Sequence, residues 1–128
     1  MPKLLVVDDE PLTVEMLQMF LEINGYETVA VLDGESALLT VQVESPDAVL
    51  LDLQLPDLSG IEVCRRLRTS PELSAFAELP IIIITAHGNP EMRRRAFEAG
   101  ANAYFTKPIR FPELLAELRR LLAAQQAK

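Results

Sequence analysis

Five short runs of mainly apolar residues recur along the chain, and the segments between them have a different periodicity. A short continuous apolar run indicates a strand that is buried on both faces, as in a parallel sheet. Strands that alternate with helices predict an α/β fold in which helices cover both faces of one sheet, and right-handed crossovers leave few topologies for it. The predicted strands are residues 4–7, 28–31, 48–51, 81–84 and 102–105.

The segments between these runs carry apolar residues at helical spacing. Ser59 and Glu62 match a capping box that opens the third helix, and Gly25 ends the first because glycine accepts the left-handed conformation. The first helix is predicted from the spacing of Leu12, Met16, Met19, Phe20 and Ile23. The predicted helices span residues 12–23, 33–43, 59–68, 89–100 and 112–122, and residues 69–79 are expected to form a connection.

Composition limits the classes of function. With 128 residues, of which 49% are hydrophobic, the chain is expected to form one domain over residues 1–122, followed by a helix end or linker start at 123–128. A formal net charge of −7 argues against direct nucleic-acid binding. Cys64 is alone, so no internal disulfide can form. No apolar run approaches the about 18 residues of a membrane span, and we expect a cytoplasmic location.

Chemically reactive side chains follow the ends of four predicted strands. The carboxyl ends of parallel strands share one edge of a sheet, which is where such folds bind ligands. We therefore expect these side chains to meet in one pocket, although any one of them alone would be ordinary as a turn or helix cap. They are Asp8 and Asp9 after the first strand, Asp52 after the third, Thr85 after the fourth and Lys107 after the fifth.

The charges expected in this pocket need compensation. Two carboxylates about 4 Å apart repel by about 4 kcal/mol at an effective dielectric constant of about 20. Raised pKa values, the ammonium of Lys107 or a divalent cation can offset this repulsion, and a few carboxylates with open positions suit Mg²⁺. A carboxylate, a hydroxyl and a lysine beside Mg²⁺ form a plausible phosphoryl-transfer site, in which the carboxylate attacks phosphorus and becomes an aspartyl phosphate.

With these residues in place, the chain closely resembles the receiver domain of two-component response regulators over essentially its whole length. The resemblance implies a flavodoxin-like (βα)5 fold with a parallel sheet of order 2-1-3-4-5. Each motif is weak alone, but all of them occur in order and at compatible spacings. They are Asp8-Asp9, Asp52 followed by Pro56 and Gly60, Thr85-Ala86, and Lys107-Pro108 with Tyr104 three residues before the lysine.

The resemblance implies that Asp52 accepts a phosphoryl group from a phosphohistidine of a sensor histidine kinase or a histidine phosphotransfer protein. It implies a Mg²⁺ ion bound by the carboxylates of Asp9 and Asp52, by the backbone carbonyl of Gln54, and by Asp8 through water. Such a domain is a phosphoacceptor switch that catalyses only its own phosphorylation and dephosphorylation, and is not an enzyme acting on other substrates.

The resemblance also implies a switch. Lys107 should pair with the phosphoryl group, Thr85 should swing to hydrogen-bond it, and Tyr104 should turn inward behind Thr85. Gln54 and His87 occupy the variable positions that tune how fast the phosphoryl group is lost. The Lys107-Pro108 bond is expected to be cis. The output surface, formed by the fourth helix, fifth strand and fifth helix, should contact an output domain or partner protein, and the chain should be a monomer or a phosphorylation-dependent homodimer.

Two other functions remain open at this point. A phosphatase of the haloacid-dehalogenase type also uses a strand-end aspartate and Mg²⁺, but it needs a second aspartate two residues later, where this chain has Gln54. A pseudo-receiver that binds partners constitutively would usually lack the acceptor aspartate or the lysine, and Asp52 and Lys107 are both present. The run Arg93-Arg94-Arg95 is expected to be a solvated surface, because consecutive helical residues point about 100° apart.

Overall fold

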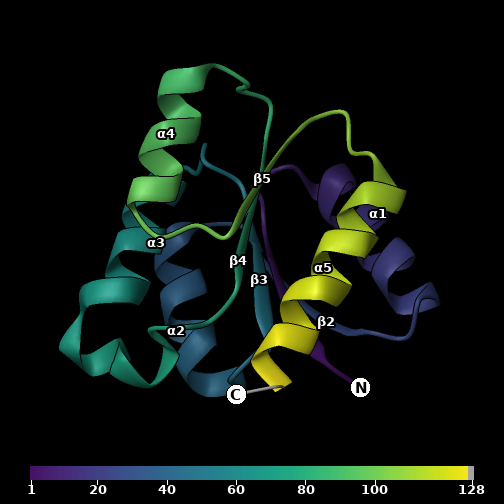
Figure 1. The fold of residues 1–128 in the computed structure, drawn as a ribbon, viewed down its shortest axis with the longest axis horizontal. Coiled ribbons are helices and arrows are strands. Elements are labelled where there is room, and N and C mark those ends of the chain that lie inside the picture. The colour runs from purple at the N-terminus through teal and green to yellow at the C-terminus, as the bar shows by residue number, and fades with distance from the viewer. Residues whose placement is uncertain (127–128) are drawn as a thin grey trace.

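Five parallel strands form one sheet in the order β2-β1-β3-β4-β5 (Figure 1). The structure is a computed structural model and describes residues 1–126. The predicted α/β class, sheet order and strand direction are confirmed. The strands are β1 (Lys3–Val7), β2 (Glu27–Val31), β3 (Ala48–Leu51), β4 (Ile81–Thr85) and β5 (Ala103–Thr106).

Helices cover both faces of the sheet. α1 and α5 pack on one face, and α2, α3 and α4 pack on the other. The connection expected at residues 69–79 contains a short 3₁₀ helix, η1 (Pro71–Phe76), which the sequence pattern did not predict. The α-helices are α1 (Pro11–Ile23), α2 (Gly34–Glu44), α3 (Gly60–Thr69), α4 (Pro90–Glu98) and α5 (Phe111–Gln126).

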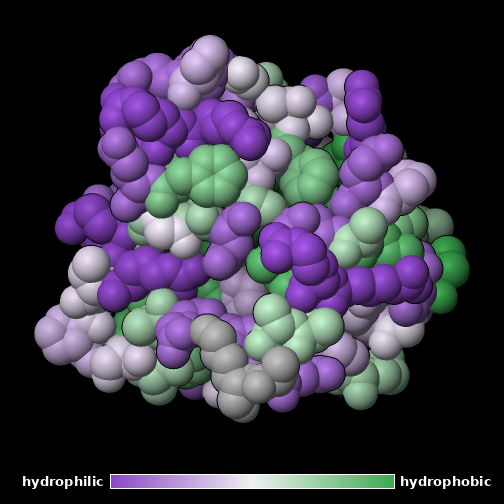
Figure 2. Space-filling view, viewed as in Figure 1, coloured by the Kyte–Doolittle hydropathy of each residue, from purple (hydrophilic) through white to green (hydrophobic). Residues whose placement is uncertain are grey.

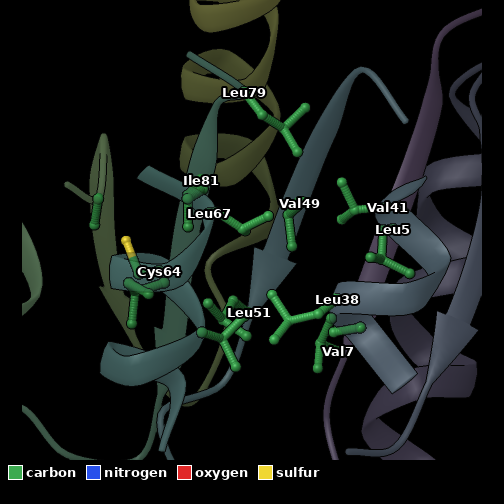
Figure 3. Packing of buried hydrophobic residues seen from close by; sticks show 14 of the residues in the cluster. Leu5, Val7, Leu38, Val41, Val49, Leu51, Cys64, Leu67, Leu79 and Ile81 are labelled. Atoms are coloured by element: carbon green, nitrogen blue, oxygen red, sulfur yellow. The ribbon is translucent and has the colours of Figure 1, made fainter. Parts of the chain in front are cut away.

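The continuous apolar runs fill two separate cores because successive strand residues point to opposite faces. In β1, Leu4 and Val6 pack with α1 and α5, whereas Leu5 and Val7 pack with α2 and α3. Figure 3 shows the second cluster, in which Leu38 of α2 lies beside β-strand side chains. A strand that contributes to both cores has no polar face, and this explains why the runs lack alternation.

The predicted first helix is present, but the apolar residues from which it was predicted are mostly not the ones that it buries. Val14, Leu17 and Leu21 are buried against the sheet. Leu12, Met16, Met19 and Ile23 are instead 52–81% exposed and form a second apolar stripe on the opposite side of α1. Hydrophobic groups are visible at the right edge of Figure 2, where Figure 1 places α1.

Side-chain caps fix three helix starts near the sheet edge. Asp33, Ser59 and Asn89 each accept a hydrogen bond from the backbone N–H three residues later, as their positions predicted. The capping box at Ser59 is only half formed, because the Glu62 carboxylate binds Arg65 and Arg66 instead.

At the carboxyl end, α5 continues without a break to Gln126, and residues 127–128 lie outside the described part of the chain. The division into a domain at 1–122 and a helix end or linker start at 123–128 stays a prediction. Among residues 1–126, none of the helices is both long and apolar enough to span a membrane.

Candidate functional site

Asp52 stands immediately after β3, in a loop that passes very close to the start of α3. The N–H of Gly60 donates to the carbonyl of Leu53 at 2.8 Å. A Cβ atom at Gly60 would lie 2.8 Å from the Cα of Leu53 and closer still to the carbonyl oxygen of Asp52. Only glycine at position 60 allows the two backbone segments to lie this close. Their contact fixes the backbone position of Asp52.

Three carboxylates meet at the carboxyl edge of the sheet, as the strand ends predicted. Asp8 and Asp9 follow β1, and oxygens of Asp8, Asp9 and Asp52 all lie within 4.8 Å of one another. Asp8 and Asp52 are 2% and 5% exposed, whereas Asp9 is exposed. Backbone N–H groups hold the two buried side chains, since Glu10 donates to Asp8 at 2.9 Å and Gln54 donates to Asp52 at 3.2 Å.

The ammonium of Lys107 binds this acidic cluster from β5. Its Nζ lies 3.0 Å from Asp8, 3.0 Å from Glu10 and 3.3 Å from Asp52. The Lys107-Pro108 peptide bond is cis, as expected. Partial burial opposes the charge on Lys107, but these carboxylates outweigh it and raise the pKa of Lys107 above its usual value. The ammonium contacts three carboxylates, and that of Asp9 lies beside them, so the pocket keeps an excess of negative charge.

This excess is visible in the pKa of Asp8. Burial raises the pKa of the Asp8 carboxyl, and the neighbouring charge of Asp52 raises it further, while the Glu10 N–H and Lys107 oppose the shift. The donor set is three carboxylates with hard oxygen atoms and an uncompensated negative charge. These residues therefore fit a Mg²⁺ ion, which prefers a few carboxylate ligands together with water or phosphate oxygens.

Mg²⁺ is expected to raise the melting temperature at pH 7 and to lose this effect as the pH falls. The folded pKa of Asp8 lies above its unfolded value, so without metal the stabilising contribution of this group is present in acid and lost as pH rises through the raised pKa. The metal competes with the proton for the same oxygens. At a concentration about 100 times its dissociation constant, Mg²⁺ adds about 2.7 kcal/mol to the free energy of unfolding. This corresponds to a rise of about 10 °C in the melting temperature.

Thermal melts from pH 4 to pH 7.5, with MgCl₂ or with NaCl at equal ionic strength, measure this effect. A Mg²⁺ gain that is the same at pH 4 and pH 7 would contradict the assignment of the ion to this acidic cluster.

The residues expected to form the switch lie beside the acidic cluster. Thr85 is fully buried at the end of β4, and its hydroxyl oxygen accepts from the N–H of His87 at 3.3 Å. Tyr104 is 9% exposed, and its hydroxyl donates to the carbonyl of His87. Its burial raises the pKa of the phenol. The side chain of Tyr104 is therefore turned inward in this structure, and the half-buried His87 contacts both switch residues through its backbone.

The three arginines of α4 diverge, as helical geometry predicted. Arg94 pairs with Glu91 and Glu98 along the helix. Arg93 stacks instead over Phe97 and Tyr104, at 5.0 Å and 5.7 Å from the ring centroids. One arginine of the run thus lies on the face formed by α4 and β5.

Two contacts at this edge were missed in the sequence. Glu10 reaches Lys107, as described above. Asp57, in the loop after Asp52, accepts from the N–H groups of Gly34 and Glu35 at 2.8 and 2.9 Å and so caps α2 from 22–23 residues away. These hydrogen bonds lower the pKa of Asp57. The acidic character of both residues was the only available signal.

The chain matches the model of the response regulator receiver domain over residues 4–119. It belongs to the response regulator receiver domain family. It is 42% identical over 122 residues to the phosphate regulon transcriptional regulatory protein PhoB of Rhizobium meliloti, covering 95% of this chain and 52% of that one. It is 37% identical to the DNA-binding dual master transcriptional regulator RpaA of Synechocystis, covering 95% of this chain and 49% of that protein.

Solved structures agree with this assignment. The crystal structure of a response regulator from Chloroflexus aurantiacus superposes with a TM-score of 0.87 at 38% identity, covering 95% of this receiver domain and 98% of that chain. The receiver domain spans about half the length of the curated relatives it matches.

Proposed function

We propose that this receiver domain accepts a phosphoryl group on Asp52 and thereby switches its affinity for a partner. One observation carries the proposal: oxygens of Asp8, Asp9 and Asp52 lie within 4.8 Å of one another, with the Lys107 ammonium 3.3 Å from Asp52. A carboxylate oxygen of Asp52 attacks phosphorus, and the leaving group departs with its bonding electron pair. The phosphohistidine of a sensor histidine kinase or histidine phosphotransfer protein is the proposed donor.

Mg²⁺ would be held by the carboxylates of Asp9 and Asp52, by the backbone carbonyl of Gln54 and, through water, by Asp8. When bound, the ion supplies positive charge beside the transferred group. The Lys107 ammonium neutralises phosphoryl charge from the other side, and the N–H of Gln54 keeps the Asp52 carboxylate oriented at 3.2 Å. Burial of Asp52 limits the access of bulk water to the acyl phosphate.

The proposed switch uses Lys107, Thr85 and Tyr104. The Thr85 hydroxyl would leave the His87 N–H and donate to the phosphoryl group, and Tyr104 fills the space behind it. Charge-assisted hydrogen bonds are worth about 1.5–3 kcal/mol each, and two of them approach the about 5.5 kcal/mol that moves a population from 1:99 to 99:1. Gln54 and His87 flank the acceptor and the switch threonine, where we propose that they set the lifetime of the phosphoryl group.

The proposed output surface is formed by α4, β5 and α5. Figure 2 shows hydrophobic side chains on this face between more hydrophilic ones. The same surface carries the aromatic pair of Phe97 and Tyr104, whose ring centroids lie 6.5 Å apart and which both stack against the guanidinium of Arg93. An output domain, a partner protein or a second copy in a phosphorylation-dependent dimer is the proposed occupant. A cytoplasmic location follows from the proposed kinase donor.

The two alternative functions have less support. A phosphatase of the haloacid-dehalogenase type needs an acid two residues after its nucleophile, and Gln54 stands there, exposed. A constitutive pseudo-receiver has no need for a lysine that reaches the acceptor aspartate, yet Lys107 makes this contact across 55 residues of chain.

Incubation with acetyl phosphate and Mg²⁺ tests the proposal. We expect intact-protein mass spectrometry to show a gain of one phosphoryl group, and borohydride reduction followed by peptide mapping to place it on Asp52. A chelator should prevent the gain, because the carboxylate cluster would then repel the incoming dianion. Phosphorylation that proceeds equally well in the chelator, or that maps elsewhere, would refute the proposed site.

A further inference from the structure

Glu10 contacts the Lys107 ammonium from the solvent side of the pocket. Its Oε1 lies 3.0 Å from Nζ, as close as the oxygen of Asp8. The Glu10 side chain is 63% exposed, whereas that of Asp8 is 3% exposed. Besides Lys107, the Glu10 carboxylate accepts from the hydroxyl of Thr13 at 3.3 Å. The contact is therefore made by a solvated arm at the start of α1.

The other two carboxylates on Lys107 are fixed. Asp8 and Asp52 each use one oxygen to accept a backbone N–H, from Glu10 and Gln54, and turn the other oxygen to the ammonium. Displacing either would break a backbone hydrogen bond in a buried position, which is costly. Glu10 can leave toward water without such a loss. An incoming anion can therefore reach the ammonium most easily by replacing Glu10.

We propose that Glu10 is a built-in competitor of the phosphoryl group for Lys107 and so slows the phosphorylation of Asp52. The Glu10 carboxylate pairs with the Lys107 ammonium, with which a phosphoryl oxygen must also pair. The negative charge of Glu10 also repels an approaching phosphate dianion. Glu10 acts through Lys107 and is a positioning residue, not a catalytic one. The inference rests on the proposed function, in which Asp52 is the phosphoacceptor.

Three variants separate the contact from the charge. Glu10→Gln keeps the size of the side chain and removes its charge. Glu10→Asp keeps the charge but shortens the side chain by one methylene, which moves the carboxylate away from Lys107. Glu15→Gln removes an exposed charge elsewhere on α1 and is the control. With acetyl phosphate and saturating Mg²⁺, we expect Glu10→Gln to raise the rate constant of phosphorylation about two- to fivefold, the factor that matches a solvent-exposed ion pair. Glu10→Asp should lie between it and wild type, and Glu15→Gln should match wild type.

Two results would overturn the inference. A Glu10→Gln rate equal to that of Glu15→Gln would mean that the contact has no role, and a slower rate would mean that Glu10 holds Lys107 ready for reaction. Calorimetry gives a second readout: the Mg²⁺ dissociation constant of Glu10→Gln should stay within about twofold of Glu15→Gln, since both lose one charge. A larger loss would assign Glu10 to the metal instead. Peptide mapping distinguishes failure of this inference from failure of the proposed function. Phosphorylation on Asp52 at an unchanged rate contradicts only the role of Glu10, whereas phosphorylation elsewhere contradicts the role of Asp52.

Discussion

Asp52→Asn is expected to abolish the mass gain that acetyl phosphate and Mg²⁺ produce in the wild-type chain. The carboxamide of asparagine is uncharged and is a poor nucleophile toward phosphorus, so the rate should fall below detection. Asp9, the exposed carboxylate of the cluster, should not substitute, because Lys107 contacts Asp8, Glu10 and Asp52. Intact-protein mass spectrometry over a time course gives the result.

Loss of folding is not expected to explain this outcome. The Asp52→Asn substitution removes one of the charges whose repulsion raises the pKa of Asp8, and Lys107 keeps Asp8 and Glu10 as partners. Without Mg²⁺ the variant should therefore melt at the wild-type temperature or above it. Asp47→Asn, which changes an aspartate at the opposite end of β3, is the matched control and should be phosphorylated normally. A persistent mass gain in Asp52→Asn would refute the assignment of the acceptor.

The meeting of the reactive side chains at one edge of the sheet could be predicted, because it follows from the parallel direction of the strands alone. Parallel strands place their carboxyl ends together, so Asp8, Asp52 and Lys107 had to meet once the apolar runs preceding them were recognised as strands. The contacts of Glu10 with Lys107 and of Asp57 with α2 could not be predicted in this way. Both depend on how loops beyond the strand ends fold back, and the sequence pattern constrains only the strands and helices themselves.

The buried face of α1 shows a second limit. Apolar residues occupy two opposite sides of this helix, so periodicity predicted the helix correctly but did not distinguish the face on the sheet from the face in water. Val14, Leu17 and Leu21 are buried, and Met16 and Ile23 are not. The exposed stripe begins at Leu12, directly after the acidic residues of the pocket.

Gly60→Ala is expected to be among the most damaging substitutions of a small residue in this chain. Its Cβ would lie 2.8 Å from the Cα of Leu53 and 3.0 Å from the carbonyl carbon of Asp52. Both are backbone atoms, so no side-chain rotation relieves the clash, and overpacking of this kind costs about 3 kcal/mol. For a domain of this size the melting temperature should fall by about 10 °C, although alanine is the better helix former by about 1 kcal/mol.

Displacement of the backbone at Asp52 should also slow phosphorylation by acetyl phosphate, even at a temperature where Gly60→Ala remains folded. Gly88→Ala is the matched control, because the Cβ there would meet only the side chain of Thr106, at 3.0 Å, and a methyl group can yield by a small rotation. We expect that control to lose little stability and to be phosphorylated at close to the wild-type rate. If Gly60→Ala instead melts at the same temperature as Gly88→Ala, the loop after β3 does not approach α3 closely. The orientation of Asp52 must then be fixed by the contacts of its side chain with the Gln54 N–H and the Lys107 ammonium.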